Sequence, residues 1–331
     1  MNTAAQRRIN RLFDQAEHNE SCLVPSKPAD TRWLQRASQR GEVVRPAAGI
    51  YARADYWQNL DAAERMLHIM RALSRLHPDW VFAGYPAAPA HGLDVGFNEL
   101  AEVCLATGAT AHTSTGGTGR RIIVSHDTPV VRQGVPVTSF PRTVGDCLRT
   151  LGFAAALAIA DSALRLKNIS ADRLERNVCA VCSRHPGLQR VRDIIRLADG
   201  RAENGGESKT RAHMIRLGFA VPDQQRPIKD PLNAGSEYYV DFAWDLPDKT
   251  VVLGELDGKE KYLNPRMTKG KSPEEVLFDE RRRESRITLG EQPVKILRFS
   301  FAEACDDTYF SRLLSSYGVP RATYVPPVAL T

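Results

Sequence analysis

No stretch of the sequence is apolar over a length that could span a bilayer, and the polar, basic N-terminus lacks the apolar core of a signal peptide. These absences predict a cytoplasmic protein with no membrane contact. Cysteine is also scarce, with six in 331 residues, and its spacing fits neither a disulfide scaffold nor a four-ligand zinc site. The one close pair, Cys179 and Cys182, falls in a predicted helix, where two buried thiols are expected.

Length and charge indicate the general class of the protein. A chain of 331 residues is long enough for two or three domains, each with its own core. The net charge of +6 and the pI near 9.0 favour an acidic partner, foremost nucleic acid. The polar, glycine-rich segment 198–206 is typical of a linker and predicts a domain boundary.

Hydrophobic periodicity predicts an α/β multidomain protein with a mixed α/β middle region. The expected helices of this region cover residues 60–76, 141–151, 153–166, 171–182 and 188–197, and the expected strands cover 99–106, 121–125 and 135–138. The predicted domains are residues 1–56, 57–200 and 201–319, followed by a proline-rich extended tail at 320–331.

Residues 238–262 contain two runs rich in aromatic and β-branched residues around a polar, proline-containing turn, which predicts an antiparallel hairpin. Alternation along the second strand places Glu255, Asp257 and Lys259 on one face, with Asp241 on the neighbouring strand. Carboxylates at the end of an apolar strand are costly unless a positive charge meets them. Mg²⁺ or Mn²⁺ fits oxygen ligands and activates water, and a lysine alongside can orient that water. The alternative is a hairpin whose charges are simply solvated.

Asp241, a short gap, and then Glu-Leu-Asp-Gly-Lys at 255–259 resemble the core of PD-(D/E)XK nucleases, in the branch of the very-short-patch-repair endonucleases. The resemblance covers about residues 205–302 in family order, with Glu207 on an opening helix and a basic helix at 278–289 after the core. It implies a restriction-endonuclease-like α/β domain that uses Mg²⁺ or Mn²⁺. The implied catalytic residues are Asp241, Glu255, Lys259 and Glu207, and the implied metal ligands are Asp241, Glu255 and Asp257.

The chain departs from that motif at two positions. Val240 replaces the proline before Asp241, and Asp257 stands where the motif has lysine. In an alternative alignment, Asp257 and Lys259 form the D-x-K element. A nuclease fold can also persist as a binding platform after activity is lost.

The first fifty residues predict a DNA-binding element. A first amphipathic helix is followed by a second that begins near Asp30 or Thr31 and ends at Gly41. Residues 42–53 then form a hairpin, so the order is that of a winged helix-turn-helix, with Arg45 and Arg53 on the wing. The outward face of the second helix carries side chains that reach phosphates and base edges, namely Arg32, Gln35, Arg36, Gln39 and Arg40. The alternative is an ordinary solvated surface.

The stretch Arg-Gly-Glu-Val-Val-Arg at 40–45, followed by Gly-Ile-Tyr at 49–51, resembles the N-terminal domain of AbiEi-family antitoxins from type IV toxin–antitoxin systems. The likeness covers about residues 5–55, and the stretch 138–147 resembles the connecting segment of the same proteins. It implies operator binding and autorepression. Residues 25–28, Pro-Ser-Lys-Pro, leave little room for the short middle helix of that domain.

Two functions follow as hypotheses. The first is a metal-dependent deoxyribonuclease that binds double-stranded DNA. The second is a catalytically silent, antitoxin-like transcriptional autorepressor, with a cognate toxin as its partner.

Overall fold

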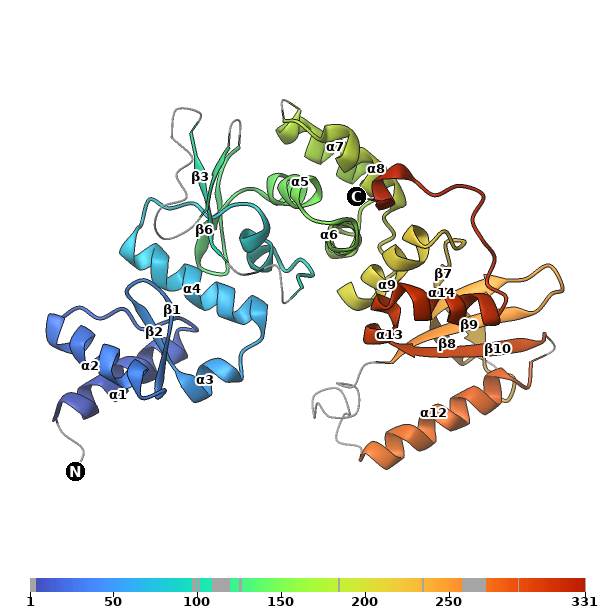
Figure 1. The fold of residues 1–331 in the computed structure, drawn as a ribbon, viewed down its shortest axis with the longest axis horizontal. Coiled ribbons are helices and arrows are strands. Elements are labelled where there is room, and N and C mark those ends of the chain that lie inside the picture. Colours follow the sequence, from blue (N-terminus) through green and yellow to red (C-terminus); the bar gives the residue numbers. More distant parts are fainter. Residues whose placement is uncertain are drawn as a thin grey trace. The chain divides into compact units, whose positions relative to one another are not determined.

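The computed structural model describes residues 4–96, 100, 102–108, 120–124, 127–183, 185–233, 235–257, 272–290 and 292–330. The chain is mixed α/β and divides into two compact units, drawn in Figure 1. The first comprises Met1–Leu151 with Ile169–Arg192, and the second comprises Gly152–Asn168 with Asp193–Thr331. None of the helices formed by the described residues has the length and apolar character needed to cross a membrane.

The first unit begins with two helices and a hairpin that enclose a small core. Buried Ile9, Phe13 and Leu34 pack with Tyr51, and the backbone of Leu23 bridges to Tyr51. No helix forms between the first two helices, as the proline-containing stretch predicted. The elements are α1 (Ala4–His18), α2 (Pro28–Gln39), β1 (Val43–Ala47), β2 (Ile50–Arg53) and α3 (Ala54–Gln58).

The second helix starts slightly earlier than expected. Pro28 is its first residue, because the missing N–H and fixed φ of proline suit that position. The hairpin pairs β1 with β2 antiparallel, and Gly49 takes a φ of +76° in the turn between them. The predicted order of helix and hairpin is therefore confirmed.

Helix α4 packs with the short strands and turns that follow it, through Met66, Met70 and Leu73. The Asp61 side chain accepts the N–H of Glu64, and the Glu64 carboxylate accepts the N–H of Asp61, which fixes the start of the helix. Strand β3 pairs parallel with β4, and β5 pairs antiparallel with β6. The elements are α4 (Ala62–Leu76), η1 (Tyr85–Ala87), η2 (Pro89–His91), β3 (Cys104–Thr107), β4 (Arg120–Ile123), β5 (Val130–Arg132), β6 (Val135–Val137), α5 (Phe140–Thr150), α7 (Ala171–Cys182) and α8 (Leu188–Leu197), which runs into the second unit.

The second unit is built on a four-stranded sheet in the order β10-β9-β8-β7. Strands β7, β8 and β9 are antiparallel neighbours, whereas β10 runs parallel to β9 after the crossover helix α12. Figure 1 shows α12 on one face of this sheet and α9, α13 and α14 on the other. The elements are α6 (Phe153–Lys167), α9 (Gly205–Arg216), β7 (Asp223–Lys229), β8 (Glu237–Asp245), β9 (Val251–Asp257), α12 (Pro273–Ile287), β10 (Val294–Ser300), α13 (Phe301–Cys305), α14 (Asp307–Ser316) and η4 (Pro327–Leu330).

Alternation along β9 divides its side chains between two cores. Val252 and Leu256 join the cluster on the α9 and α14 face, and Val251 and Leu253 join Ile287 on the α12 face. Buried apolar side chains thus fix the strand from both sides. The predicted hairpin at 238–262 is confirmed as β8 and β9 as far as residue 257, and the rest of that range lies outside the described residues.

Two expectations about connecting segments need correction. Segment 198–206 is packed inside the second unit: Asp199 N–H donates to the Asp161 carboxylate at 2.8 Å, and Ala202 is fully buried. Of the tail expected at 320–331, the described residues 320–330 are not an extended appendage, because Arg321 stacks on Phe219 and the turn η4 buries two apolar side chains. Both segments looked solvent-exposed by composition, yet tertiary contacts hold them.

Candidate functional site

Two carboxylates of the second unit share one hydrogen-bond donor. The side-chain amide nitrogen of Gln225 donates to Glu207 Oε2 at 3.1 Å and to Asp241 Oδ1 at 3.3 Å. Glu207 lies in the first turn of α9 and is only 4% exposed, and Asp241 lies on β8. The structure therefore brings together two of the predicted acidic residues, on one helix and one strand.

Hydrogen bonds from nearby backbone N–H groups and from one side-chain amide hold each carboxylate in place. Asn204 caps α9 by accepting the N–H of Gly206 and of Glu207, and its own amide donates to Glu207 Oε1 at 2.5 Å. The N–H of Glu203 donates to Glu207 Oε2 at 2.8 Å. Asp241 Oδ2 accepts the N–H of Leu256 at 2.8 Å, which anchors this carboxylate to the neighbouring strand β9.

Glu207 has a perturbed protonation equilibrium. Burial raises the pKa of Glu207 to about 7, and the negative charge of Asp241 acts in the same direction. Mg²⁺ is commonly held by one or two carboxylates together with water and substrate phosphate oxygens. Glu207 and Asp241 fit such a minimal donor set, since a divalent cation would offset the repulsion between them.

Gln225 was not among the predicted site residues. Its φ of +48° lies in the left-handed region, which is uncommon for a residue with a side chain and is concentrated at functional sites. The flanking register pairs Gln224 with Phe242 and Arg226 with Val240, so Gln225 lies opposite Asp241. Only the pairing of β7 with β8 reveals this position, and nothing in the local sequence signals it.

Glu255 and Asp257 lie at the α12 face of the sheet, each paired with an arginine. Arg283 of α12 contacts Glu255 Oε1 at 2.7 Å. Arg298 of β10 binds Asp257 through two nitrogens, at 2.8 and 2.6 Å, and also contacts Glu284 at 2.6 Å. The carboxylates that the sequence placed beside a metal are therefore neutralised by guanidinium groups.

The metal group predicted from Asp241, Glu255 and Asp257 is not formed by the described residues. In that part of the chain, no three side chains among His, Cys, Asp and Glu are arranged to hold a metal ion. Alternation along β9 turns Glu255 and Asp257 toward α12, whereas Asp241 contacts Gln225 and Glu207 lies on the other side of that amide. Lys259, the fourth predicted catalytic residue, lies outside the described residues.

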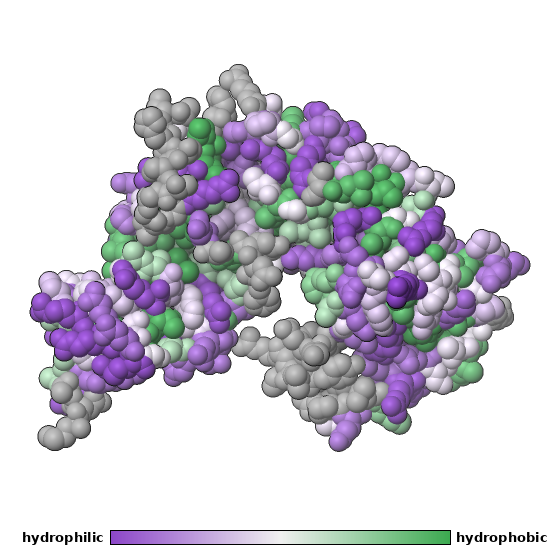
Figure 2. Space-filling model, in the orientation of Figure 1, coloured by the Kyte–Doolittle hydropathy of each residue, from purple (hydrophilic) through white to green (hydrophobic). Residues whose placement is uncertain are grey.

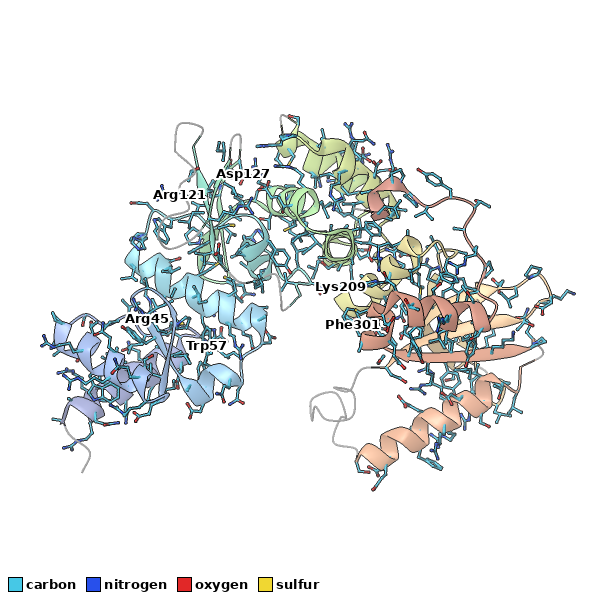
Figure 3. The ribbon with its side chains drawn as sticks, in the orientation of Figure 1. Arg45, Trp57, Arg121, Asp127, Lys209 and Phe301 are labelled. Carbon is cyan, nitrogen blue, oxygen red and sulfur yellow. The ribbon has the colours of Figure 1, made fainter. Side chains whose placement is uncertain are left out.

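Helix α2 of the first unit presents the predicted polar face. Its buried side includes Leu34 and Ala37, and the surface over α1 and α2 is strongly hydrophilic in Figure 2. Arg45 is exposed on strand β1 (Figure 3). Arg40 forms an exposed ion pair with Glu42 at 2.7 Å. The exposed residues that were predicted to contact DNA are Arg32, Gln35, Arg36, Gln39, Arg40 and Arg45.

Arg53, the second predicted wing residue, has a different place. Its guanidinium contacts Asp14 at 2.7 Å and Glu17 at 2.8 Å, and it donates to the carbonyl of Asn10 at 3.0 Å. It also lies over the Phe13 ring. The expectation that Arg53 faces phosphate is corrected, because the acidic face of α1 binds this side chain within the unit.

Comparison with known proteins identifies curated relatives whose names state no activity. No protein-family model matches the chain. Two curated relatives from Mycobacterium tuberculosis, Uncharacterized protein MT2308 of strain CDC 1551 / Oshkosh and Uncharacterized protein Rv2248 of strain ATCC 25618 / H37Rv, are each 36% identical over 102 residues. The match covers 31% of this chain and 36% of each relative, so it spans about a third of their length.

Proposed function

We propose that the protein binds double-stranded DNA and that its second unit hydrolyses phosphodiester bonds with the help of Mg²⁺ or Mn²⁺. The observation that carries this proposal is the pairing of Glu207 and Asp241 across Gln225, with the pKa of Glu207 raised to about 7. Buried, mutually repelling carboxylates are characteristic of sites that bind a cation or move a proton.

The order of helices and strands in the second unit supports the same proposal. Helix α9 is followed by the antiparallel strands β7, β8 and β9, then by α12 and by β10 parallel to β9. This is the order that the resemblance to PD-(D/E)XK nucleases implies. The exposed arginine and glutamine side chains of α2 supply a surface suited to phosphates and base edges.

Each residue has a defined part in the proposed reaction. Glu207 and Asp241 would hold the cation, which when bound supplies charge stabilisation and an activated water. Leu256 N–H and the Gln225 amide keep Asp241 oriented. Lys259 is proposed to orient the water. Glu255 faces α12 and is paired with Arg283, so it is not among the residues proposed to hold the cation.

A second candidate function is a silent, antitoxin-like transcriptional autorepressor that works with a cognate toxin. The observation that favours it is the neutralisation of Glu255 by Arg283 and of Asp257 by Arg298. In this case the first unit would recognise an operator, and the second unit would serve as a scaffold.

Incubation of supercoiled plasmid with the full chain in Mg²⁺ or Mn²⁺ separates the two candidates. Nicking is expected for the wild type and for Asp245→Asn, an exposed carboxylate on the same strand, and not for Asp241→Asn or in EDTA. Circular dichroism confirms that both variants fold. Absence of nicking in both metals, with DNA still retarded on a gel, would reject the nuclease and favour the repressor.

A further inference from the structure

The first unit contains a hollow of about 510 Å³ that shares no lining residue with α2 or with the carboxylate pair. Its walls come from η1, from strands β3 and β4, and from α5, with one residue that follows α7. A hollow of this size can hold a small organic molecule. Its lining residues are Gly84, Tyr85, Pro86, Glu102, Cys104, Arg120, Ile122, Ile123, Arg142, Asp146, Arg149, Thr150, Leu151 and His185.

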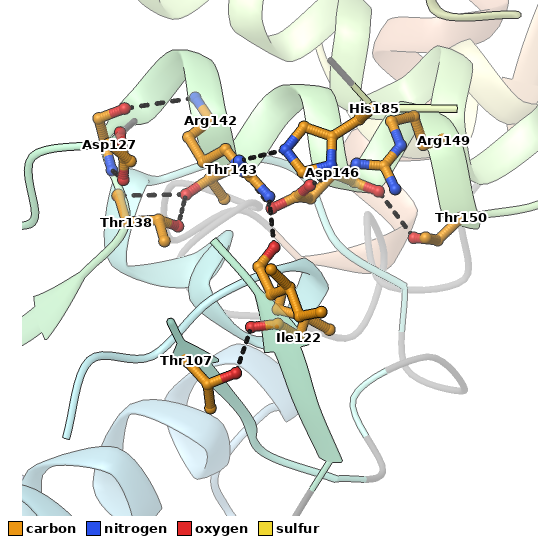
Figure 4. A network of polar contacts seen from close by, with 12 residues as sticks. Thr107, Ile122, Asp127, Thr138, Arg142, Thr143, Asp146, Arg149, Thr150 and His185 are labelled. Carbon is orange, nitrogen blue, oxygen red and sulfur yellow. Dashed lines mark hydrogen bonds and ion pairs between the residues drawn. The ribbon is translucent and has the colours of Figure 1, made fainter. Parts of the chain in front are cut away.

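A buried network of charged side chains forms one wall. Arg142, only 1% exposed, donates from Nε to Asp146 Oδ2 at 2.8 Å and from Nη2 to the carbonyl of Ile123 at 3.0 Å. Its Nη1 lies 2.9 Å from His185 Nε2. Arg149 donates to the other oxygen of Asp146 at 3.1 Å. Figure 4 shows these side chains gathered at α5.

The stability of the fold does not by itself explain why this wall consists of charged side chains. Desolvation of paired charges costs several kcal/mol per ion, and a packed apolar cluster of the same volume is often at least as stable. Yet the network lies against an open hollow. Its rigid contacts fix the direction of the Arg149 side chain and of the His185 ring, as expected of a preorganised binding site.

The charges that line the hollow favour an anion. The lining carries three arginines, Arg120, Arg142 and Arg149, and two carboxylates, Glu102 and Asp146. Burial lowers the pKa of His185, and the positive charges of Arg142 and Arg149 lower it further. This favours the neutral ring, which can accept a hydrogen bond from Arg142.

Arg120 adds a positive charge that is not part of the network around Arg142. It lies exposed on β4, and its guanidinium makes no hydrogen bond or ion pair to any other residue in the described ranges. Tyr85, Pro86 and Ile122 also line the hollow and provide apolar surface. The lining of the hollow thus combines cationic groups with apolar surface.

We propose that this hollow binds a small organic anion whose phosphate or carboxylate group pairs with Arg120 and Arg149, and whose flat apolar body lies against Tyr85 and Ile122. Arginine is the side chain best suited to such acidic groups, because its planar fork can form two parallel hydrogen bonds. Arg142 acts as a positioning residue that holds Asp146 and His185.

Calorimetric titration of the full chain with four probes tests the proposal. Adenosine 5′-monophosphate tests a phosphate on an aromatic body, benzoate tests a carboxylate on such a body, and adenosine and inorganic phosphate test the body and the anion alone. Saturable binding of adenosine 5′-monophosphate or benzoate, at least about tenfold tighter than adenosine and inorganic phosphate, is expected, and the stronger of the two identifies the acidic group.

Variants decide whether the binding occurs in this hollow. Arg120→Gln and Arg149→Gln are each expected to weaken the binding by about tenfold or more, because each removes a charge-assisted hydrogen bond. Arg132→Gln, an exposed arginine on β5 that does not line the hollow, should leave the affinity unchanged. Two results would overturn the proposal: no saturable binding of either organic anion up to about 10 mM, or binding that Arg120→Gln and Arg149→Gln leave intact.

Discussion

The carboxylates of Glu207 and Asp241 face one another across the side-chain amide of Gln225, whose nitrogen lies 3.1 Å from one and 3.3 Å from the other. The amide carries only a partial positive charge. It therefore separates the two acids without neutralising them, and a proton or a cation is needed to balance the pair.

This arrangement predicts that the free energy of unfolding depends on pH through Glu207. The variant Glu207→Gln should remove this dependence. The pKa of Glu207 is about 7 in the folded chain against an ordinary value of 4.5, so at intermediate pH the native state keeps a proton that the unfolded state has lost. Stability contributed by this group is present below pH 4.5 and is lost as pH rises toward 7. Relative to the variant, the wild type should lose about 2 to 3 kcal/mol of unfolding free energy across that window.

Urea denaturation at several pH values between about 4.5 and 8 measures this difference. Glu237→Gln, an exposed glutamate on β8, serves as the control and should follow the wild type. Parallel stability profiles for the wild type and Glu207→Gln would contradict the coupling.

A second prediction concerns the interior of the second unit. Asp161 is fully buried and accepts two contacts from Arg211 Nη2, at 2.9 and 2.8 Å. Asp161→Asn leaves the Arg211 charge buried without a counter-ion, so we expect a loss of about 3 to 5 kcal/mol in unfolding free energy. Asp245→Asn, which weakens an exposed pair with Arg226, should cost less than about 1 kcal/mol. Equal losses in the two variants, measured by chemical denaturation, would count against the buried pair as a structural anchor.

A third prediction separates DNA contact from structural support among the arginines of the first unit. Arg32→Gln and Arg36→Gln should weaken DNA binding and lower the slope of log affinity against log salt by about 0.9 for each phosphate that the variant no longer neutralises. Arg53→Gln should instead lower the thermal stability, because this side chain is tied to Asp14 and Glu17. Fluorescence anisotropy over a salt series, paired with thermal melts, distinguishes these effects. An unchanged salt slope in both α2 variants would show that this face of α2 does not contact DNA phosphates.

A fourth prediction concerns Arg283, which forms an ion pair with Glu255. Because Glu255 faces α12, on the other side of the sheet from Glu207, Arg283→Gln is expected to leave Mn²⁺ binding by Glu207 and Asp241 unchanged. Electron paramagnetic resonance of free Mn²⁺ measures this affinity without any need for DNA cleavage. Arg282→Gln removes an exposed arginine that pairs with Asp279 on the same helix, and should bind Mn²⁺ like the wild type. Mn²⁺ binding that is several-fold tighter in Arg283→Gln than in Arg282→Gln would contradict this expectation and would place Glu255 in the metal site.

Local patterns predicted the features that depend on one element. The outward face of α2 follows from helical periodicity, since the apolar residues Leu34 and Ala37 lie on its buried side. The hairpin of β8 and β9 follows from its composition. Helix α7 begins at Ala171 and ends at Cys182 as expected, because Ser170 caps it and an apolar stripe continues along it.

Sequence patterns did not predict the relationships between distant elements. Gln225 joins the carboxylates only because β7 pairs with β8, and Arg53 turns inward only because acidic residues of α1 lie beside the hairpin. The same holds for Arg142 and His185, which meet although 43 residues separate them. Such relationships depend on tertiary packing, which the periodicity of a single segment does not encode.

Helix α6 has a consequence for how this protein can be divided or recombined. The chain leaves the first unit after residue 151, returns at 169 and leaves again after 192, so no single cut releases two intact halves. A fragment that starts at residue 201 would retain Arg211 and lack Asp161. Exchange of the second unit by gene fusion would thus require α6 to be supplied as well, and fragment complementation with a 152–168 peptide becomes a natural route to rebuild it.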